Sequence, residues 1–266
     1  MRHPTEEELL RALEPYQKRI KGYEDRKVYD QFFDKRTLLS LYELMNDGII
    51  ETVDFPISTG KEGGVFKGTA PDRHALAVKI YRITNADFRS IWQYVAADER
   101  FRNMSRNFTR LIHAWVQREY TNLQRLKECG LPVPRPLAKS GNVLAMEYIG
   151  DEEGPAPLLK DYDATAQELA AFYAQVVDFM RHAYNDAQLV HADLSQYNLM
   201  VHKGMLYVID CSQSMSTRHP NALEFLMRDI MNVNRYFSSK RVNVIEKKEL
   251  LIQITGGVDA VSAHSS

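Results

Sequence analysis

The spacing of apolar residues divides the chain into a strand-rich first half and a helix-rich second half. Helical spacing of apolar residues predicts four helices, over residues 35–46, 111–128, 164–185 and 221–237. Short apolar runs between turns predict an antiparallel meander over 49–57, 65–68 and 75–83, and further strands over 135–140 and 143–148. This order of elements predicts an α+β fold with two lobes and a cleft near residues 147–157.

The pattern also suggests three parts of the chain. We expect an N-terminal helical extension over 1–48, an N-lobe with an antiparallel sheet and a long helix over 49–148, and a mainly helical C-lobe over 149–266. Residues 84–110 are polar and rich in arginine, which suggests a mobile or partly ordered segment. Its arginines either keep a solvated loop soluble or contact RNA.

Composition narrows the class of protein. The 266 residues are 44% hydrophobic and 26% charged, as in an ordinary globular protein, and the net charge of -1 gives no overall basic field for a nucleic-acid partner. The two cysteines, Cys129 and Cys211, have no metal-binding spacing and fit a reducing compartment. Since we find neither an apolar signal segment nor a run of about 18 apolar residues, we expect a cytoplasmic protein without a membrane partner.

Polar residues interrupt the apolar stretch LVHADLSQYNLMV over residues 189–201. Asp193 and Asn198 lie five positions apart in its polar centre, between two strand-like runs. One interpretation is that their side chains only make the turn hydrogen bonds that are common in loops. The spacing His191-x-Asp193-x-x-x-x-Asn198 is instead typical of a phosphoryl-transfer loop when a second carboxylate lies nearby.

A hairpin predicted directly after this loop supplies the second carboxylate. If the hairpin turns at Lys203-Gly204, antiparallel pairing places Asn198 opposite Ile209. Asp210 follows directly, so an amide oxygen and a carboxylate come to the same end of the hairpin. Oxygen ligands of this kind suit a hard cation such as Mg²⁺. The sequence therefore predicts a metal site at Asn198 and Asp210, with Asp193 close by.

Three further features agree with phosphoryl transfer. Lys79 is the single charge within the apolar run over 75–81, and Glu119 falls on the apolar stripe of a helix, so the two charges would stabilise each other when buried. The other interpretation of Lys79 is a lysine that faces solvent on a half-exposed strand. The turn STGKEGGV over 58–65 fits a kinase phosphate loop with Ser58 in place of the first glycine, and it also fits an ordinary hairpin turn.

Three strings of residues resemble the RIO kinase family, and its Rio-one branch in particular. In chain order they are STGKEGGVFKG (58–68), LVHADLSQYN (189–198) and IDCSQSM (209–215). The resemblance covers roughly residues 35 to 240. Gly63-Gly64 departs from the Ala-Asn that is usual in this branch. The resemblance implies a two-lobed protein-kinase-like fold with a trimmed C-terminal lobe and an N-terminal helical extension. The lack of an Ala-Pro-Glu segment after Asp210 agrees with the trimmed lobe.

The resemblance also implies a role for each site residue. Lys79 would hold the α- and β-phosphates of ATP, and Glu119 would orient Lys79. Asp193 would position or deprotonate the acceptor, whereas Asn198 and Asp210 would bind Mg²⁺ or Mn²⁺. His191 and Asp229 would brace the catalytic loop. The other nucleotide contacts would come from the phosphate loop and from the end of the strand at 143–148, namely Ser58, Gly60, Lys61, Gly63, Val65, Met146, Glu147 and Ile149.

The activity implied by the resemblance is that of an atypical, ATP-dependent serine/threonine protein kinase with ATPase activity. Such a protein would autophosphorylate, with Ser105 as the expected site, and Asp210 would itself accept a phosphoryl group. Its partner would be the pre-ribosomal small subunit, both protein and rRNA. Composition indicates no oligomeric state.

Two alternative functions fit the same motifs. One is an ATP-dependent clamp in ribosome assembly that has little kinase activity. The other is a small-molecule phosphotransferase of the aminoglycoside or choline kinase type, which shares the His-x-Asp-x4-Asn spacing. The second alternative generally requires a larger C-terminal lobe than this chain supplies.

Overall fold

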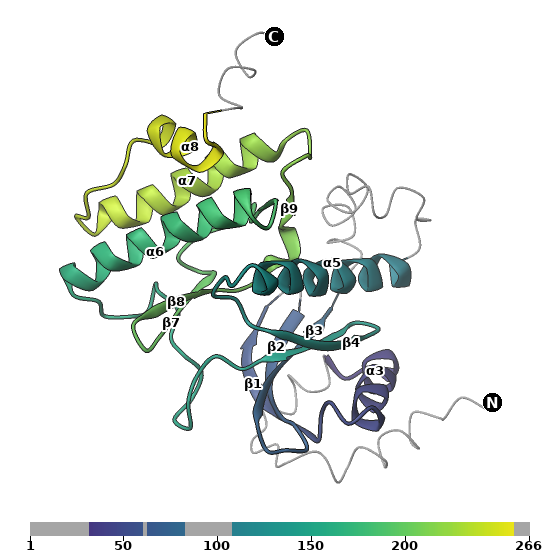
Figure 1. Cartoon of the computed structure of the whole chain (residues 1–266). Helices are drawn as coiled ribbons and strands as arrows, with labels where there is room; N and C mark the ends of the chain where they lie inside the picture. The colour runs from purple at the N-terminus through teal and green to yellow at the C-terminus, as the bar shows by residue number, and fades with distance from the viewer. Residues whose placement is uncertain (1–31, 61–62, 83–107, 258–266) are drawn as a thin grey trace. The chain divides into compact units, whose positions relative to one another are not determined.

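The structure, a computed structural model, describes residues 32–60, 63–82 and 108–257 (Figure 1). Contacts between residues divide the chain into two compact units. Unit 1 contains Met1–Tyr120 and Arg135–Tyr148, and unit 2 contains Thr121–Pro134 and Ile149–Ser266. The units interleave along the chain, and the predicted division into 1–48, 49–148 and 149–266 stays a prediction.

Unit 1 is built on a five-stranded antiparallel sheet, which confirms the predicted meander. The spatial order of the strands is β1 (Thr52–Thr59), β2 (Gly63–Thr69), β3 (Ala75–Tyr81), β5 (Val143–Glu147) and β4 (Pro136–Ser140). Strand β1 begins and ends later than its predicted bounds, so that Ser58 is part of the strand rather than of the following loop.

The two faces of this sheet carry different residues. Val65 pairs with Lys79, and Ala77 pairs with Met146, so these four side chains share one face. The opposite face joins the hydrophobic core of unit 1 together with helix α3 (Lys35–Asn46). That core contains Phe66, Val78 and Ile80 from the sheet and Leu38, Leu41 and Leu44 from α3.

Helix α3 has the bounds that its apolar spacing predicts. Leu38, Leu41 and Leu44 recur every three residues and are buried, while Asp34 caps the start of the helix by accepting a hydrogen bond from the Thr37 amide at 2.9 Å. Helix α5 (Phe108–Glu128) begins three residues before its predicted start. The segment 84–110 that was predicted to be mobile or partly ordered therefore overlaps α5 at 108–110, and its other residues, 84–107, lie outside the described residues.

Unit 2 contains helices and two small sheets. Helices α6 (Ala166–Asn185) and α7 (Ala222–Ser239) lie within two residues of their predicted bounds. The hairpin of β7 (Leu199–His202) and β8 (Met205–Val208) has the predicted register. Strand β6 (Leu189–Val190) lies in the strand-like run predicted before Asp193. Three further elements of unit 2 were not predicted, namely α8 (Lys247–Thr255), β9 (Met215–Ser216) and the 3₁₀ turn η3 (Cys211–Gln213).

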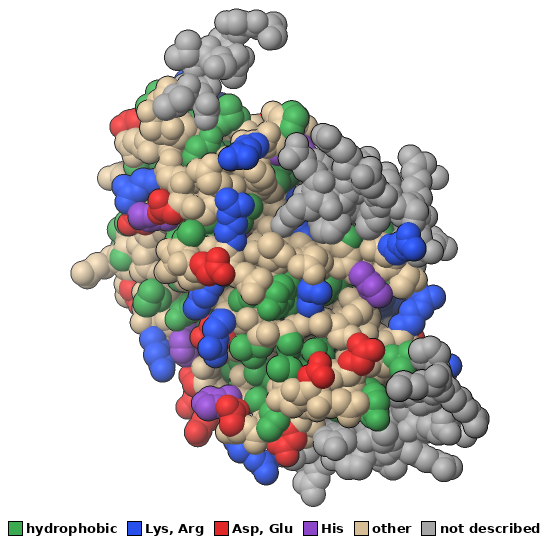
Figure 2. Space-filling model, turned by 45° about the vertical axis from the view of Figure 1, so that its right-hand side comes forward, with side chains coloured by type: hydrophobic (Ala, Val, Ile, Leu, Met, Phe, Trp, Pro, Cys, Tyr) green, Lys and Arg blue, Asp and Glu red, His purple; other side chains and the backbone are tan. Residues whose placement is uncertain are grey.

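The described surface carries both signs of charge. Figure 2 shows lysine and arginine side chains interspersed with aspartate and glutamate over one face, which fits the net charge of -1. Within the described ranges, every helix is too short or too polar to span a bilayer.

Candidate functional site

The predicted ion pair is present in unit 1. Lys79 projects from β3, and its Nζ atom lies 2.9 Å from Oε1 of Glu119 on α5. Only 12% of the lysine side chain and 1% of the glutamate side chain are exposed. Such burial is stable only when the two charges compensate each other, so the alternative of a solvent-facing lysine is wrong.

The glycine-rich stretch forms the hairpin between β1 and β2. Ser58 pairs with Val65, and the Gly60 amide donates a hydrogen bond to the Gly63 carbonyl at 2.8 Å. Lys61 lies outside the described residues. A Cβ atom added to Gly63 would come within 2.5 Å of the carbonyl oxygen of Ile80, so this close approach of β2 to β3 requires glycine. Glycine at position 63, the first of the two positions that depart from Ala-Asn, therefore fits this close packing.

The predicted adenine-binding residues lie at the end of β5 and just after it. Met146 is buried, at 8% exposure, on the same face of the sheet as Lys79. The Glu147 amide donates to the Arg135 carbonyl at 2.8 Å, and the Ile149 carbonyl accepts from the Ala156 amide at 3.0 Å. Adenine contacts from these two residues would therefore use the Glu147 carbonyl, which has two lone pairs, and the Ile149 amide.

In unit 2 the chain brings Asp193, Asn198 and Asp210 together. The Asn198 side-chain amide donates to the Asp193 carbonyl at 2.8 Å and to its Oδ2 at 3.3 Å. The Ile209 amide donates to the Asn198 carbonyl at 2.9 Å, so the predicted pairing at the end of the hairpin is confirmed. Asp210 follows with φ 58° and ψ 65°, a left-handed conformation that is uncommon outside glycine and costs backbone energy.

The two carboxylates of this site repel each other. Burial first, and then the charge of Asp210, raises the pKa of Asp193, whereas the hydrogen bond from Asn198 and the charge of Arg228 act in the opposite direction. A divalent cation placed near both carboxylates would relieve this repulsion.

The donor atoms fit a hard cation. Because both hydrogen bonds of Asn198 to Asp193 use its amide nitrogen, the amide oxygen is the atom that it offers to a ligand. Asp210 adds carboxylate oxygens, one of which accepts a hydrogen bond from Ser212 at 2.7 Å. Over the described part of the chain no group of three or more His, Cys, Asp or Glu side chains could hold a metal ion, so a cation here would depend on the Asn198 oxygen and on nucleotide phosphates.

A buried aspartate braces the loop that carries Asp193. Asp229 on α7, which is 1% exposed, accepts hydrogen bonds from the amides of Ala192 at 2.7 Å and Leu194 at 2.9 Å. Burial raises its pKa to about 7, although the two amides and Arg228 oppose this shift. Arg228 itself donates a hydrogen bond to the Ala192 carbonyl.

His191 links the same loop to the end of β8. Its Nδ1 atom accepts from the Asp193 amide at 3.3 Å, and its Nε2 atom lies 3.3 Å from the Ile209 carbonyl. An acceptor at Nδ1 and a donor at Nε2 describe a neutral imidazole. These bonds confirm the bracing positions predicted for His191 and Asp229.

Sequence reasoning missed three polar side chains at this site. Ser212 bonds to Asp210, and the Gln213 side chain lies 3.4 Å from Asp193 Oδ2. Asn122, on α5, bonds to the backbone around η3. The string IDCSQSM contains the first two residues, but nothing in the sequence near Asn122 indicates its partners, which lie 89 and 92 positions away.

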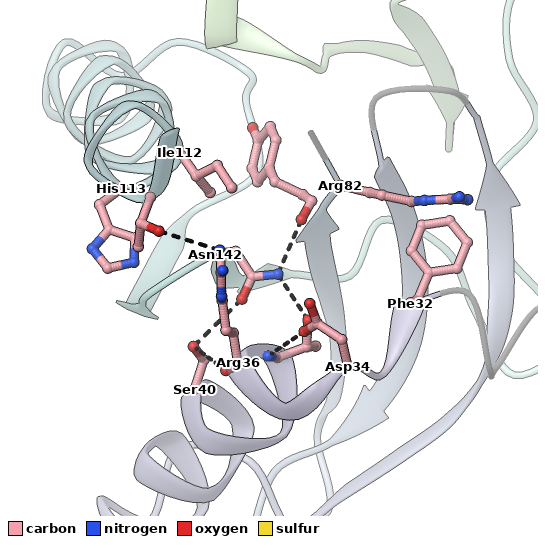
Figure 3. A pocket seen from close by; sticks show the side chains of 11 residues that line it. Phe32, Asp34, Arg36, Ser40, Arg82, Ile112, His113 and Asn142 are labelled. Atoms are coloured by element: carbon pink, nitrogen blue, oxygen red, sulfur yellow. Dashed lines mark hydrogen bonds between the residues drawn. The ribbon is translucent and has the colours of Figure 1, made fainter. Parts of the chain in front are cut away.

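A separate pocket of about 100 Å³ lies in unit 1, where α3, the start of α5 and the turn before β5 meet (Figure 3). Asn142 connects its walls, since its side chain bonds to Thr37, Ser40 and the Tyr81 carbonyl. None of the residues predicted to bind nucleotide lines this pocket. We therefore interpret this pocket as part of the packing interface between α3 and the rest of unit 1.

Comparison with known proteins places the sequence in a family. A family model described as RIO domain matches residues 64–250. The serine/threonine-protein kinase RIO1 of Caenorhabditis elegans is 40% identical over 235 residues, which make up 88% of this chain and 46% of that protein. The RIO-type serine/threonine-protein kinase Rio1 of Haloferax volcanii is 40% identical over 227 residues, 85% of this chain and 77% of that protein. The chain spans about half the length of the first of these relatives.

A solved structure shows the same fold. The complex of Rio2 kinase with ADP/Mg²⁺ and phosphoaspartate from Chaetomium thermophilum superposes with a TM-score of 0.61, covering 86% of this chain and 73% of that one at 17% identity. This likeness confirms the predicted α+β, protein-kinase-like fold. Because the RIO domain model covers more than half of the sequence, and the Haloferax relative aligns over most of its own length, the chain belongs to the RIO family.

Proposed function

We propose that this protein is an ATP-dependent serine/threonine protein kinase of RIO type that also hydrolyses ATP. The observation that carries the proposal is the cluster of Asp193, Asn198 and Asp210 in unit 2. The Lys79–Glu119 ion pair in unit 1 supports it, because a lysine held by a buried glutamate presents a fixed positive charge to phosphate groups. The names of the RIO1 relatives agree with this activity.

Each unit carries groups that suit a part of ATP. In unit 1, Lys79 binds the α- and β-phosphates, the 58–65 hairpin covers the phosphates, and Met146 with the backbone of Glu147 receives adenine. Ile149 belongs to unit 2 and offers its backbone amide to adenine. In unit 2, Asn198 and Asp210 hold Mg²⁺ or Mn²⁺ through oxygen atoms. The cation neutralises phosphate charge when it is bound.

Asp193 receives the proton of the acceptor. In transfer to a serine, the hydroxyl oxygen attacks the γ-phosphorus, the bond from this phosphorus to the bridging oxygen breaks, and ADP leaves with the electron pair. The hydroxyl proton passes to Asp193, which must therefore be ionised beforehand. Its raised pKa makes it a better proton acceptor than an ordinary aspartate.

A second route passes through Asp210 and rests on family resemblance, supported by the phosphoaspartate in the Rio2 complex. A carboxylate oxygen of Asp210 attacks the γ-phosphorus, and ADP leaves. Water then attacks the phosphorus of the acyl phosphate, Asp193 takes a proton from this water, and Asp210 is released as a carboxylate together with inorganic phosphate. The net reaction is hydrolysis of ATP.

The biological setting also rests on family resemblance. We propose that the protein acts in the cytoplasm on the pre-ribosomal small subunit. Binding of the purified protein to small-subunit precursors, with and without ATP, would test this setting independently of the chemistry.

A single-turnover reaction with γ-labelled ATP and Mg²⁺ tests the activity. We expect label on protein serine, stable to hydroxylamine, or a hydroxylamine-labile label at Asp210 followed by phosphate release. Asp193→Ala should bind nucleotide but lower turnover by about 10²-fold or more, since general base catalysis contributes this much. Neither label nor phosphate release from the wild type, or wild-type turnover by Asp193→Ala, would refute the proposal.

A further inference from the structure

A buried asparagine holds the turn that follows Asp210. Asn122 on α5 is 1% exposed, and its side-chain amide donates to the carbonyls of Cys211 at 3.0 Å and Ser214 at 2.9 Å. These carbonyls stand at the start of η3 and immediately after it. Both N–H bonds of one side chain therefore fix both ends of a single turn.

The side chains of this turn reach both carboxylates of the candidate site. The Ser212 hydroxyl donates to Asp210 Oδ1 at 2.7 Å, and the Gln213 amide lies 3.4 Å from Asp193 Oδ2. Asp210 precedes the turn in a left-handed conformation, which the chain does not keep unless its neighbours hold it. The location of η3 thus determines where the two carboxylates lie.

We propose that Asn122 is a positioning residue for phosphoryl transfer, and that it acts by anchoring η3 so that Ser212 and Gln213 keep Asp210 and Asp193 in place for the cation and the acceptor. The proposal rests on the proposed function. Asn122 is not a catalytic residue, because its side chain contacts the backbone of the turn and not the reacting groups. Its loss should affect metal binding and turnover more than binding of the nucleotide itself.

The test substitutes Asn122→Leu, which keeps the approximate size of the side chain and removes both donors. We expect the Mg²⁺ concentration that gives half-maximal turnover to rise by about tenfold or more, as when residues behind metal ligands are changed. Metal-free binding of ATP should stay within about twofold of the wild type, since that binding draws on groups of unit 1.

The matched control is Asn185→Leu. The Asn185 amide also donates to two backbone carbonyls, those of Arg181 at 2.8 Å and Ile254 at 2.7 Å, and it belongs to the same unit without contacting the site. A general loss of stability would appear in both variants. A shift in the Mg²⁺ requirement in Asn122→Leu alone would identify positioning.

A second variant covers the case in which Asn122→Leu does not fold. Ser212→Ala removes one hydrogen bond at the other side of the turn and should raise the Mg²⁺ requirement in the same direction by a smaller factor. A wild-type Mg²⁺ requirement in the folded Asn122→Leu variant, or in Ser212→Ala, overturns the positioning role. Absence of Mg²⁺-dependent turnover in the wild type instead overturns the proposed function.

Discussion

The acid–base behaviour of Asp193 depends on an arginine outside the predicted motifs. Arg228 lowers the pKa of Asp193, whereas burial and Asp210 raise it. In Arg228→Gln the pKa should therefore rise further, and because Asp193 must be ionised to accept a proton, the acidic limb of the rate profile should move to higher pH. The measurement is kcat/KM as a function of pH.

A suitable control for this prediction is Arg181→Gln. Arg181 forms an exposed ion pair with Asp178 on α6 at 2.8 Å, and it does not contact the site. The pH profile of kcat/KM for Arg181→Gln should match that of the wild type. An acidic limb of Arg228→Gln that stays in place or moves to lower pH would contradict the assigned role of Asp193 as the base.

Residues could be predicted where their charges complement each other or where hairpin pairing places them at the same end. Residues whose side chains bond only to the backbone could not be predicted. Glu119 is conspicuous as a charge on an apolar stripe, and Lys79 is the natural partner in the apolar strand. Asn198 and Asp210 follow from hairpin pairing. The Asn122 side chain donates to two backbone carbonyls, and every residue has a carbonyl, so no sequence pattern shows which ones it reaches.

At the scale of elements, Asn142 joins helix α3 to the sheet of unit 1 (Figure 3). Its amide nitrogen donates to the Thr37 hydroxyl at 2.9 Å and to the Tyr81 carbonyl at 3.0 Å. Asn142→Ala would leave these partly buried acceptors without this donor, so we expect the free energy of unfolding to fall by about 1–3 kcal/mol. Denaturant titration of the purified protein measures this change.

The control variant for the stability loss expected in Asn142→Ala is Asn221→Ala. Asn221 precedes α7, and its side chain makes no capping hydrogen bond, so the expected change is within about 0.5 kcal/mol. Equal losses in the two variants would mean that the Asn142 bonds do not hold α3 to the sheet.

Elements with a long, regular pattern were predictable. The leucines of α3 and the hairpin of β7 and β8 each combine a period with a clear turn, and both agree with the structure. Strand β9 has two residues, which is too short for any period to show. Helix α8 begins with charged residues, Lys247 to Glu249, so its apolar positions are too few to reveal it.

At the scale of the whole molecule, the order of elements was sufficient to predict an α+β fold with two lobes. The kinase-like character of the fold was implied by the resemblance of the motifs to the RIO family, and the Rio2 structure agrees. The composition of the two units was not predictable in the same way. Residues 121–134 belong to unit 2 although residues on both sides belong to unit 1, because such membership depends on tertiary contacts that no local pattern encodes.

A ligand that binds only the folded protein raises its stability, and this gives a test on the whole chain. ATP with Mg²⁺ at about 100 times its Kd should stabilise the wild type by about 2.7 kcal/mol, visible as an increase in Tm. In Asp210→Ala the part of this increase that requires Mg²⁺ should disappear, because the cation loses a carboxylate ligand. Asp178→Ala, which removes an exposed carboxylate on α6, should keep it. An Mg²⁺-dependent increase that survives in Asp210→Ala would exclude Asp210 as an essential metal ligand.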